Sequence, residues 1–153
     1  MKKLLHLIQA LESHIPKKDT IAPVVSAGTV GWHIEHSLLV IIQIIEGVKR
    51  SDPAKYKWVF NFKRLVILGS NKIPRGKAKA PDSVSPKEEA NELALFESIT
   101  KARNSINELL ACPKNSYFIH PYFGQLNKAA TIRFFEVHTK HHLKIIQAIL
   151  QYK

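Results

Sequence analysis

The segment RFFEVHTKHHLKIIQAIL, residues 133–150, has apolar residues at the spacing of an α-helix. At roughly 100° per residue, with His138 at zero, one face between about −20° and 80° collects the large apolar side chains, namely Phe135, Ile145, Ile146 and Ile149. His142 lies at about 40° in the same face, and His141 lies at about −60° on its margin. The pattern predicts a helix whose buried stripe contains two histidines one turn apart.

Helical signals continue outward from this segment through most of the chain. A first helix is indicated by an apolar stripe that stops before Pro16 and consists of Leu4, Ile8, Leu11 and Ile15. The second helix contains WHIEHSLLVIIQIIEGVKR, with Ser26 as its predicted N-cap, and ends before Asp52, which caps a short helical turn. Residues 58–70, WVFNFKRLVILGS, are predicted to be helical up to Gly69, and residues 71–86 to form a loop.

The last two predicted helices have clear N-terminal signals. Ser85 and Glu88 match a capping box with Pro86 in the first turn, ahead of the stripe Leu95, Ile99, Ala102, Ile106 and Leu109. Asn127 is the predicted cap of a helix from Lys128 to Gln151, and no segment alternates as a β-strand does. The sequence therefore predicts one domain over residues 1–153: an all-α four-helix bundle with a long irregular connection between helices two and three.

The composition limits the class of protein. One cysteine among 153 residues excludes an internal disulfide and a paired-cysteine zinc site, and it favours the cytoplasm. The formal charge of +11 comes from basic residues dispersed along a chain without a nucleic-acid-binding motif, so no specific nucleic-acid partner is expected. The apolar run LLVIIQII, residues 38–45, falls short of the roughly 20 residues that cross a bilayer, so no membrane partner is expected.

Two histidines at positions i and i+4 of one helical face can hold one transition metal, and the alternative is a pair of buried histidines satisfied by hydrogen bonds. His138 and His142 have this spacing. A third ligand could come from the second helix, where His33 and His36 both lie among apolar residues. The helical phase does not choose between these two, because the second helix is apolar almost all round.

Several motifs resemble, in order along the chain, a small branch of the DinB-like superfamily of metal-binding four-helix bundles. They are VGW before a histidine of the second helix, IPRGKAKAP, HPYFGQLNKAATIRFF and HTKHHLKII. The resemblance implies that His36, His138 and His142 are the metal ligands. It makes His33 and His141 neighbours that support the ligands or replace one of them. The chain departs from many members of the superfamily in lacking their H-R-G-Q continuation, in place of which it has HHLKII.

Three imidazole ligands leave a coordination position open, as in catalytic rather than structural sites. Zinc suits these ligands best, and nickel also accepts imidazole. The resemblance implies a metal-dependent hydrolase or a low-molecular-weight-thiol S-transferase acting on a small-molecule substrate, anionic or thiol-containing. The alternatives are a non-catalytic metal-binding protein with a structural or sensing role, and a binder of polyanions.

Two other expectations concern the surface. Arg75 and Lys77 in the long connection either attract an anionic substrate or belong to a solvated charged loop. The apolar circumference of the second helix permits a homodimer.

Overall fold

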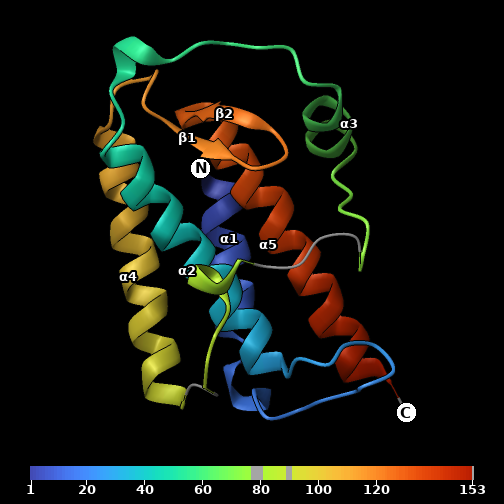
Figure 1. The fold of residues 1–153 in the computed structure, drawn as a ribbon. Helices are drawn as coiled ribbons and strands as arrows, with labels where there is room; N and C mark the ends of the chain where they lie inside the picture. Colours follow the sequence, from blue (N-terminus) through green and yellow to red (C-terminus); the bar gives the residue numbers. More distant parts are fainter. Residues whose placement is uncertain (77–80, 89–90, 153) are drawn as a thin grey trace.

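The computed structural model describes residues 1–76, 81–88 and 91–152, and within them it contains five α-helices and one small antiparallel sheet (Figure 1). The helices are α1 (Lys2–Glu12), α2 (Val30–Lys49), α3 (Phe62–Ser70), α4 (Glu92–Ala111) and α5 (Lys128–Gln151). The strands β1 (Tyr117–His120) and β2 (Gly124–Asn127) precede α5. Three 3₁₀ turns, Ile15–Lys17, Pro53–Lys55 and Asp82–Val84, lie in the connections.

The predicted all-α four-helix bundle is therefore wrong in two respects. The segment 58–70, predicted to be helical but not counted among the four helices, forms a fifth helix, α3, and the predicted turn-rich connection before the last helix contains a β-hairpin, paired from Tyr117 with Asn127 to His120 with Gly124. Each strand has four residues, which is too short for an alternating pattern to stand out among the surrounding turn residues. Gly124, with φ at 68°, begins β2 in the left-handed conformation that glycine adopts without strain.

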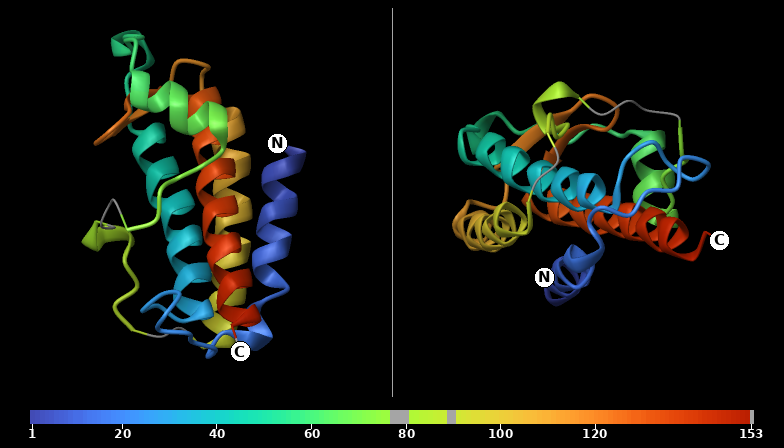
Figure 2. Two further views of the ribbon diagram at one scale, coloured as in Figure 1. Left: turned by 90° about the vertical axis from the view of Figure 1, so that its right-hand side faces the viewer. Right: turned by 90° about the horizontal axis from the view of Figure 1, so that it is seen from below.

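The longer helices α1, α2, α4 and α5 lie side by side, and α2 packs against both α4 and α5 (Figures 1 and 2). The predicted stripe of α1 is buried completely, since Leu4, Ile8 and Leu11 have no exposed surface. The predicted stripe of α4 is buried as well. The smaller α3 contacts α5 near the end of the molecule that carries the hairpin. This arrangement brings the first two turns of α2 against the middle of α5.

One of the three predicted N-caps of the long helices is confirmed, and two are wrong. Asn127 caps α5 as predicted, because its side chain accepts a hydrogen bond from the Ala130 amide. The cap of α2 is Thr29 rather than the predicted Ser26, and the cap of α4 is Asn91 rather than Ser85. Ser85 instead follows a 3₁₀ turn, where its hydroxyl donates to the carbonyl of Pro81. Serine satisfies either arrangement equally well, so its presence alone does not fix a helix start.

Within the described parts of the chain, none of the helices combines the length and the apolar character that a membrane span requires.

Candidate metal centre

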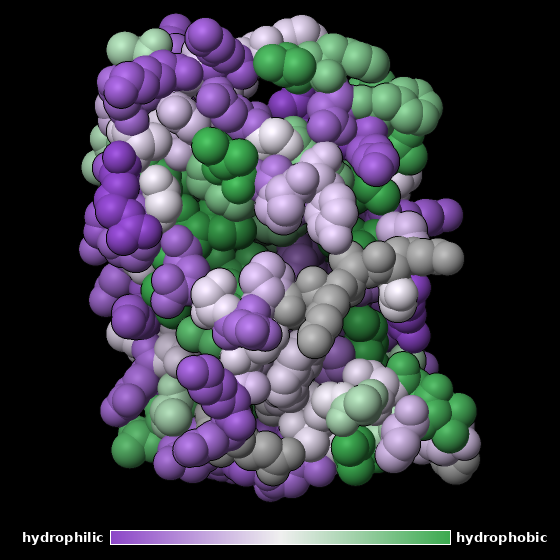
Figure 3. Space-filling view, in the orientation of Figure 1, coloured by the Kyte–Doolittle hydropathy of each residue, from purple (hydrophilic) through white to green (hydrophobic). Residues whose placement is uncertain are grey.

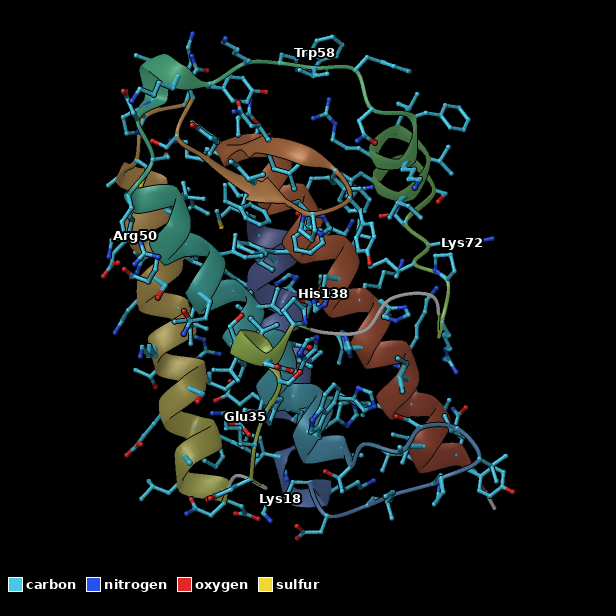
Figure 4. All side chains as sticks on the ribbon, viewed as in Figure 1. Lys18, Glu35, Arg50, Trp58, Lys72 and His138 are labelled. Carbon is cyan, nitrogen blue, oxygen red and sulfur yellow. The ribbon has the colours of Figure 1, made fainter. Side chains whose placement is uncertain are left out.

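Three histidines from two helices converge in the interior of the molecule. His36 comes from the second turn of α2, and His138 and His142 come from successive turns of α5. Each ring offers one nitrogen such that the three nitrogens lie within 4.8 Å of one another. Figure 4 shows His138 between α2 and α5, near the middle of the molecule. The cap at Thr29 starts α2 one turn ahead of His33, and the packing of α2 against α5 sets the remaining geometry.

The His36 ring is held by a hydrogen bond and by a stacked aromatic ring. Its Nδ1 lies 2.8 Å from the main-chain carbonyl oxygen of Val84, which can only accept, so Nδ1 carries the proton and donates. This fixes the tautomer and leaves Nε2 with a free lone pair. The ring of Trp32 stacks on the ring of His36, with the ring centroids 5.0 Å apart and the ring planes 10° from parallel.

His142 is held by a second histidine. Its Nδ1 lies 3.0 Å from Nδ1 of His33, and Nε2 of His33 lies 2.9 Å from the hydroxyl oxygen of Ser26. That hydroxyl oxygen also accepts a hydrogen bond from the Gly28 amide. If His142 donates from Nδ1, then His33 accepts at Nδ1 and donates from Nε2 to Ser26. This polarity leaves Nε2 of His142 free for a metal, whereas the opposite polarity protonates it.

His138 is the histidine with an unsatisfied atom. Its side chain is only partly buried, yet its Nδ1 is inaccessible to solvent and has no hydrogen-bond partner among the described residues. Its ring lies 4.5 Å from the ring of His142, 5.2 Å from that of His36 and 5.5 Å from that of Phe134, measured between centroids. A buried nitrogen without a partner costs roughly 1–3 kcal/mol, which coordination of a cation would offset. The donor set thus fits a transition-metal ion.

Burial keeps these imidazoles in the form that binds metals. It lowers the pKa of His36 and holds the pKa values of His138 and His142 well below the ordinary value, with the neighbouring histidines adding to the effect. The pKa of His33 is lowered to about 4, again chiefly by burial. Neutral imidazole has the lone pair that a metal needs, so no proton has to be displaced at neutral pH.

The structure also locates the other residues that the sequence singled out. His33 hydrogen-bonds to His142 and is not one of the three histidines whose ring nitrogens lie within 4.8 Å of one another. His141 is partly exposed and makes an edge-on ring contact with His142, with centroids 5.2 Å apart. Arg75 donates from Nη2 to the carbonyl oxygen of Lys144, at 3.3 Å, and Lys77 lies outside the described residues.

No pattern in the sequence indicates that Val84 and Ser26 contribute to the centre. Val84 supplies only its main-chain carbonyl, which no side-chain pattern reveals. Ser26 has the residue type of a helix cap and was predicted as one, although its hydroxyl instead contacts His33. Trp32 belongs to the VGW motif of the resemblance. It lies one turn before His36 on α2, and the two rings stack.

We compared the chain with models of known protein families, with curated proteins and with solved structures, and found no match in any of the three. The chain is mostly helical and carries a buried cluster of three histidines that could hold a metal ion.

Proposed function

We propose that this protein is a metal-dependent enzyme in which His36, His138 and His142 hold one divalent transition-metal ion, zinc by preference. The observation that carries the proposal is the convergence of three ring nitrogens within 4.8 Å, from helices far apart in the sequence. His138 Nδ1 supports it, because this buried atom has no hydrogen-bond partner among the described residues and most buried polar atoms have one.

The three-ligand set favours catalysis over a purely structural role. Structural zinc sites are closed by four protein ligands, and catalytic sites commonly have three. A divalent cation in such a site supplies Lewis acidity at a position that the protein does not fill. Around it, Val84 and His33 orient the rings of His36 and His142 through hydrogen bonds. Trp32 and Phe134 cover parts of the ligand rings with apolar surface.

The reaction class rests on a different basis from the metal site. Hydrolysis and transfer of a low-molecular-weight thiol are the chemistries implied by the resemblance to the DinB-like superfamily, and we propose them on that resemblance alone. Both fit a small-molecule substrate. Burial is the main cause of the lowered pKa values of His33 and His141, and the positive charge of Arg75 lowers them further. This nearby charge favours an anionic substrate.

Elemental analysis of the purified protein, after reloading with zinc and dialysis, tests the metal site. Wild-type protein should hold about one equivalent of zinc per chain. His36→Gln and His142→Ala should hold far less, and exposed His6→Ala is the matched control that should keep it. The His36→Gln side chain still has a donor for the carbonyl of Val84, so its loss of zinc would report lost ligation rather than lost folding. Stoichiometric zinc in both variants would refute the site.

A second measurement separates an enzyme from a structural metal protein. Cobalt(II) in place of zinc gives an absorption spectrum that changes when an external ligand joins the metal. If the site is catalytic, a small thiol or an inorganic anion should change that spectrum. A spectrum indifferent to every small ligand, together with a large loss of thermal stability on chelation, would indicate a structural site.

A further inference from the structure

A second feature, separate from the histidines, is a cluster of exposed apolar side chains at the end of the molecule that carries the hairpin. The connection from α2 and the helix α3 expose Trp58, Val59, Phe60, Phe62, Leu65 and Val66, whose exposed fractions run from 45% to 68%. Ile119 and Tyr122 of the hairpin, also more than half exposed, extend the cluster, which we call the apolar patch. Figure 3 shows hydrophobic residues gathered at the upper right of the molecule, where Figure 1 places α3.

The helix α3 has its apolar face turned outward. Phe62, Leu65 and Val66 follow the i, i+3, i+4 spacing of one helical face, and all three are exposed. Ile67 and Leu68 on the other side are only partly buried, and none of the nine residues of α3 is fully buried. An ordinary surface helix packs its apolar stripe against the core. In α3 the apolar stripe is instead exposed to the surroundings of the molecule.

Hydrogen bonds to the hairpin fix the segment that carries the apolar patch. The Lys57 amide donates to Oε1 of Gln125 at 2.7 Å, and the Asn61 side chain donates to the carbonyl of Tyr122 at 3.1 Å. Arg64 donates from Nη1 to the carbonyl of Gln125 at 3.1 Å, and its guanidinium carbon lies 5.8 Å from the centre of the Trp58 ring. Figure 4 shows Trp58 on the outer side of this connection. The apolar side chains are therefore displayed by a segment tied to β2 and its turn.

The same segment carries only positive charge. Residues 53–81 contain no aspartate or glutamate, and they contain the basic residues Lys55, Lys57, Lys63, Arg64, Lys72, Arg75, Lys77 and Lys79. Lys57 and Lys63 are exposed beside the patch, and Lys72 points away from the molecule in Figure 4. Apolar side chains flanked by lysine and arginine are the composition of elements that lie in the interface of an anionic lipid bilayer.

We propose that the apolar patch adsorbs to an anionic membrane surface, with its aromatic and aliphatic side chains in the interface and its basic residues against lipid headgroups. A second copy of the chain is disfavoured as the occupant, because a two-fold contact would bring two acid-free segments together. A single-stranded nucleic acid would use the aromatic rings but not Val59, Leu65 or Val66, which offer no stacking face. Adsorption requires no membrane span, and the proposal replaces the expectation that the protein has no membrane partner.

Co-sedimentation with vesicles tests this proposal on the full chain. The protein should sediment with vesicles of phosphatidylcholine and phosphatidylserine, much less with phosphatidylcholine alone, and less again at raised ionic strength. Phe60→Ser with Leu65→Ser should weaken binding roughly tenfold or more, since both side chains lose their place in the interface. Lys57→Gln with Lys63→Gln should weaken it about fivefold for each lysine removed.

Matched controls make the outcome specific to the patch. Leu93→Ser with Phe96→Ser removes the same two residue types from the exposed surface at the start of α4, at the opposite end of the molecule (Figure 1). Lys87→Gln with Lys101→Gln removes the same charge away from the patch. Both controls should bind as wild type does, and circular dichroism should show all variants folded.

Four results would overturn the proposal. The first is failure of wild-type protein to bind anionic vesicles, and the second is an equal loss of binding in the control variants. Another is a dimer in light scattering that the patch variants dissociate, which would make a second copy the occupant. The last is binding of single-stranded oligonucleotides that depends on the patch while vesicles are ignored. The metal-site variants should leave vesicle binding unchanged, because the patch and the histidines are separate.

Discussion

The Nδ1 atoms of His33 and His142 lie 3.0 Å apart, so α2 supplies both a candidate metal ligand, His36, and the hydrogen-bond partner of another candidate ligand on α5. A metal-binding histidine usually donates its second ring N–H to an acceptor that fixes the ring and raises its basicity. For His36 the acceptor is a carbonyl oxygen, and for His142, in the polarity that leaves its Nε2 free for a metal, it is the imidazole of His33. The two ligands are thus oriented by parts of the chain that do not themselves face the ion.

The first prediction concerns His33. His33→Phe should weaken zinc binding roughly 10–100-fold, because His142 loses the acceptor that holds its ring. His33→Gln should recover part of the loss, since an amide oxygen can accept the same hydrogen bond. The dissociation constants are measured by competition with a chromophoric chelator. Equal affinities of the Phe variant and wild type would contradict the role assigned to His33, and melting curves of the metal-free proteins would reveal a purely structural effect.

The second prediction concerns the start of α2. Thr29 accepts a hydrogen bond from the Trp32 amide at 3.0 Å, so Thr29→Ala should destabilise the metal-free protein by about 1 kcal/mol. Ser26→Ala should cost less in stability, because Ser26 is not the cap, but should weaken zinc binding through His33. Urea denaturation and metal titration of both variants measure the two effects. A larger loss of stability in Ser26→Ala than in Thr29→Ala would indicate that Ser26, and not Thr29, caps α2.

The third prediction concerns His120 and acid stability. Nδ1 of His120 accepts hydrogen bonds from the amides of Tyr122 and Phe123, at 3.1 and 3.3 Å, and the ring stacks on Phe123. Burial lowers the pKa of His120 from 6.5 to about 4. On acidification, His120 is protonated in the unfolded chain before it is protonated in the folded one. Its contribution to the free energy of unfolding is therefore intact above pH 6.5 and is lost as the pH falls toward about 4.

His120→Asn keeps an acceptor in the turn and does not titrate in this range. Its free energy of unfolding should therefore fall less than that of wild type between pH 6.5 and about 4, by on the order of 2 kcal/mol after allowance for partial exposure of the ring. Urea denaturation across the pH range gives the difference. The exposed His6→Asn serves as control, and parallel curves for His120→Asn and wild type would contradict the assignment.

The fourth prediction concerns the attachment of α3. Arg133 on α5 donates from Nε and Nη2 to the carbonyl oxygen of Leu68, at 3.2 and 2.9 Å, and from Nη1 to Glu136 at 3.1 Å. Arg133→Met should loosen α3 and speed limited proteolysis within residues 62–70. The cost in global stability should be only about 1 kcal/mol, because α3 contributes little to the core.

Arg103→Met is the matched control for that experiment. Arg103 pairs with Glu12 and so links α4 to α1, away from α3. This variant should leave the cleavage rate within residues 62–70 unchanged. Equal acceleration in both variants would mean that α3 is not held by Arg133 in particular.

Local patterns in the sequence determined most of the helices and two of the three histidines of the candidate site. The stripes of α1, α4 and α5 depend on residues three or four apart, which a helix brings together whatever its neighbours are. The same rule placed His138 and His142 on one face of α5, and Asn127 capped α5 as predicted because a cap contacts only the next turn. The hairpin was not predicted, because each of its strands is too short to show a clear alternation of apolar and polar residues.

Tertiary structure alone decided which histidine of α2 joins that pair. His33 and His36 lie one turn apart on a helix that is apolar almost all round, so its own periodicity could not select one of them. The rotation and shift of α2 against α5 put His36 into the group of three and His33 against Nδ1 of His142. The Val84 carbonyl reaches His36 only after the long connection folds back over α2. These contacts depend on packing between distant segments, and side-chain spacing along a single helix carries no information about such packing.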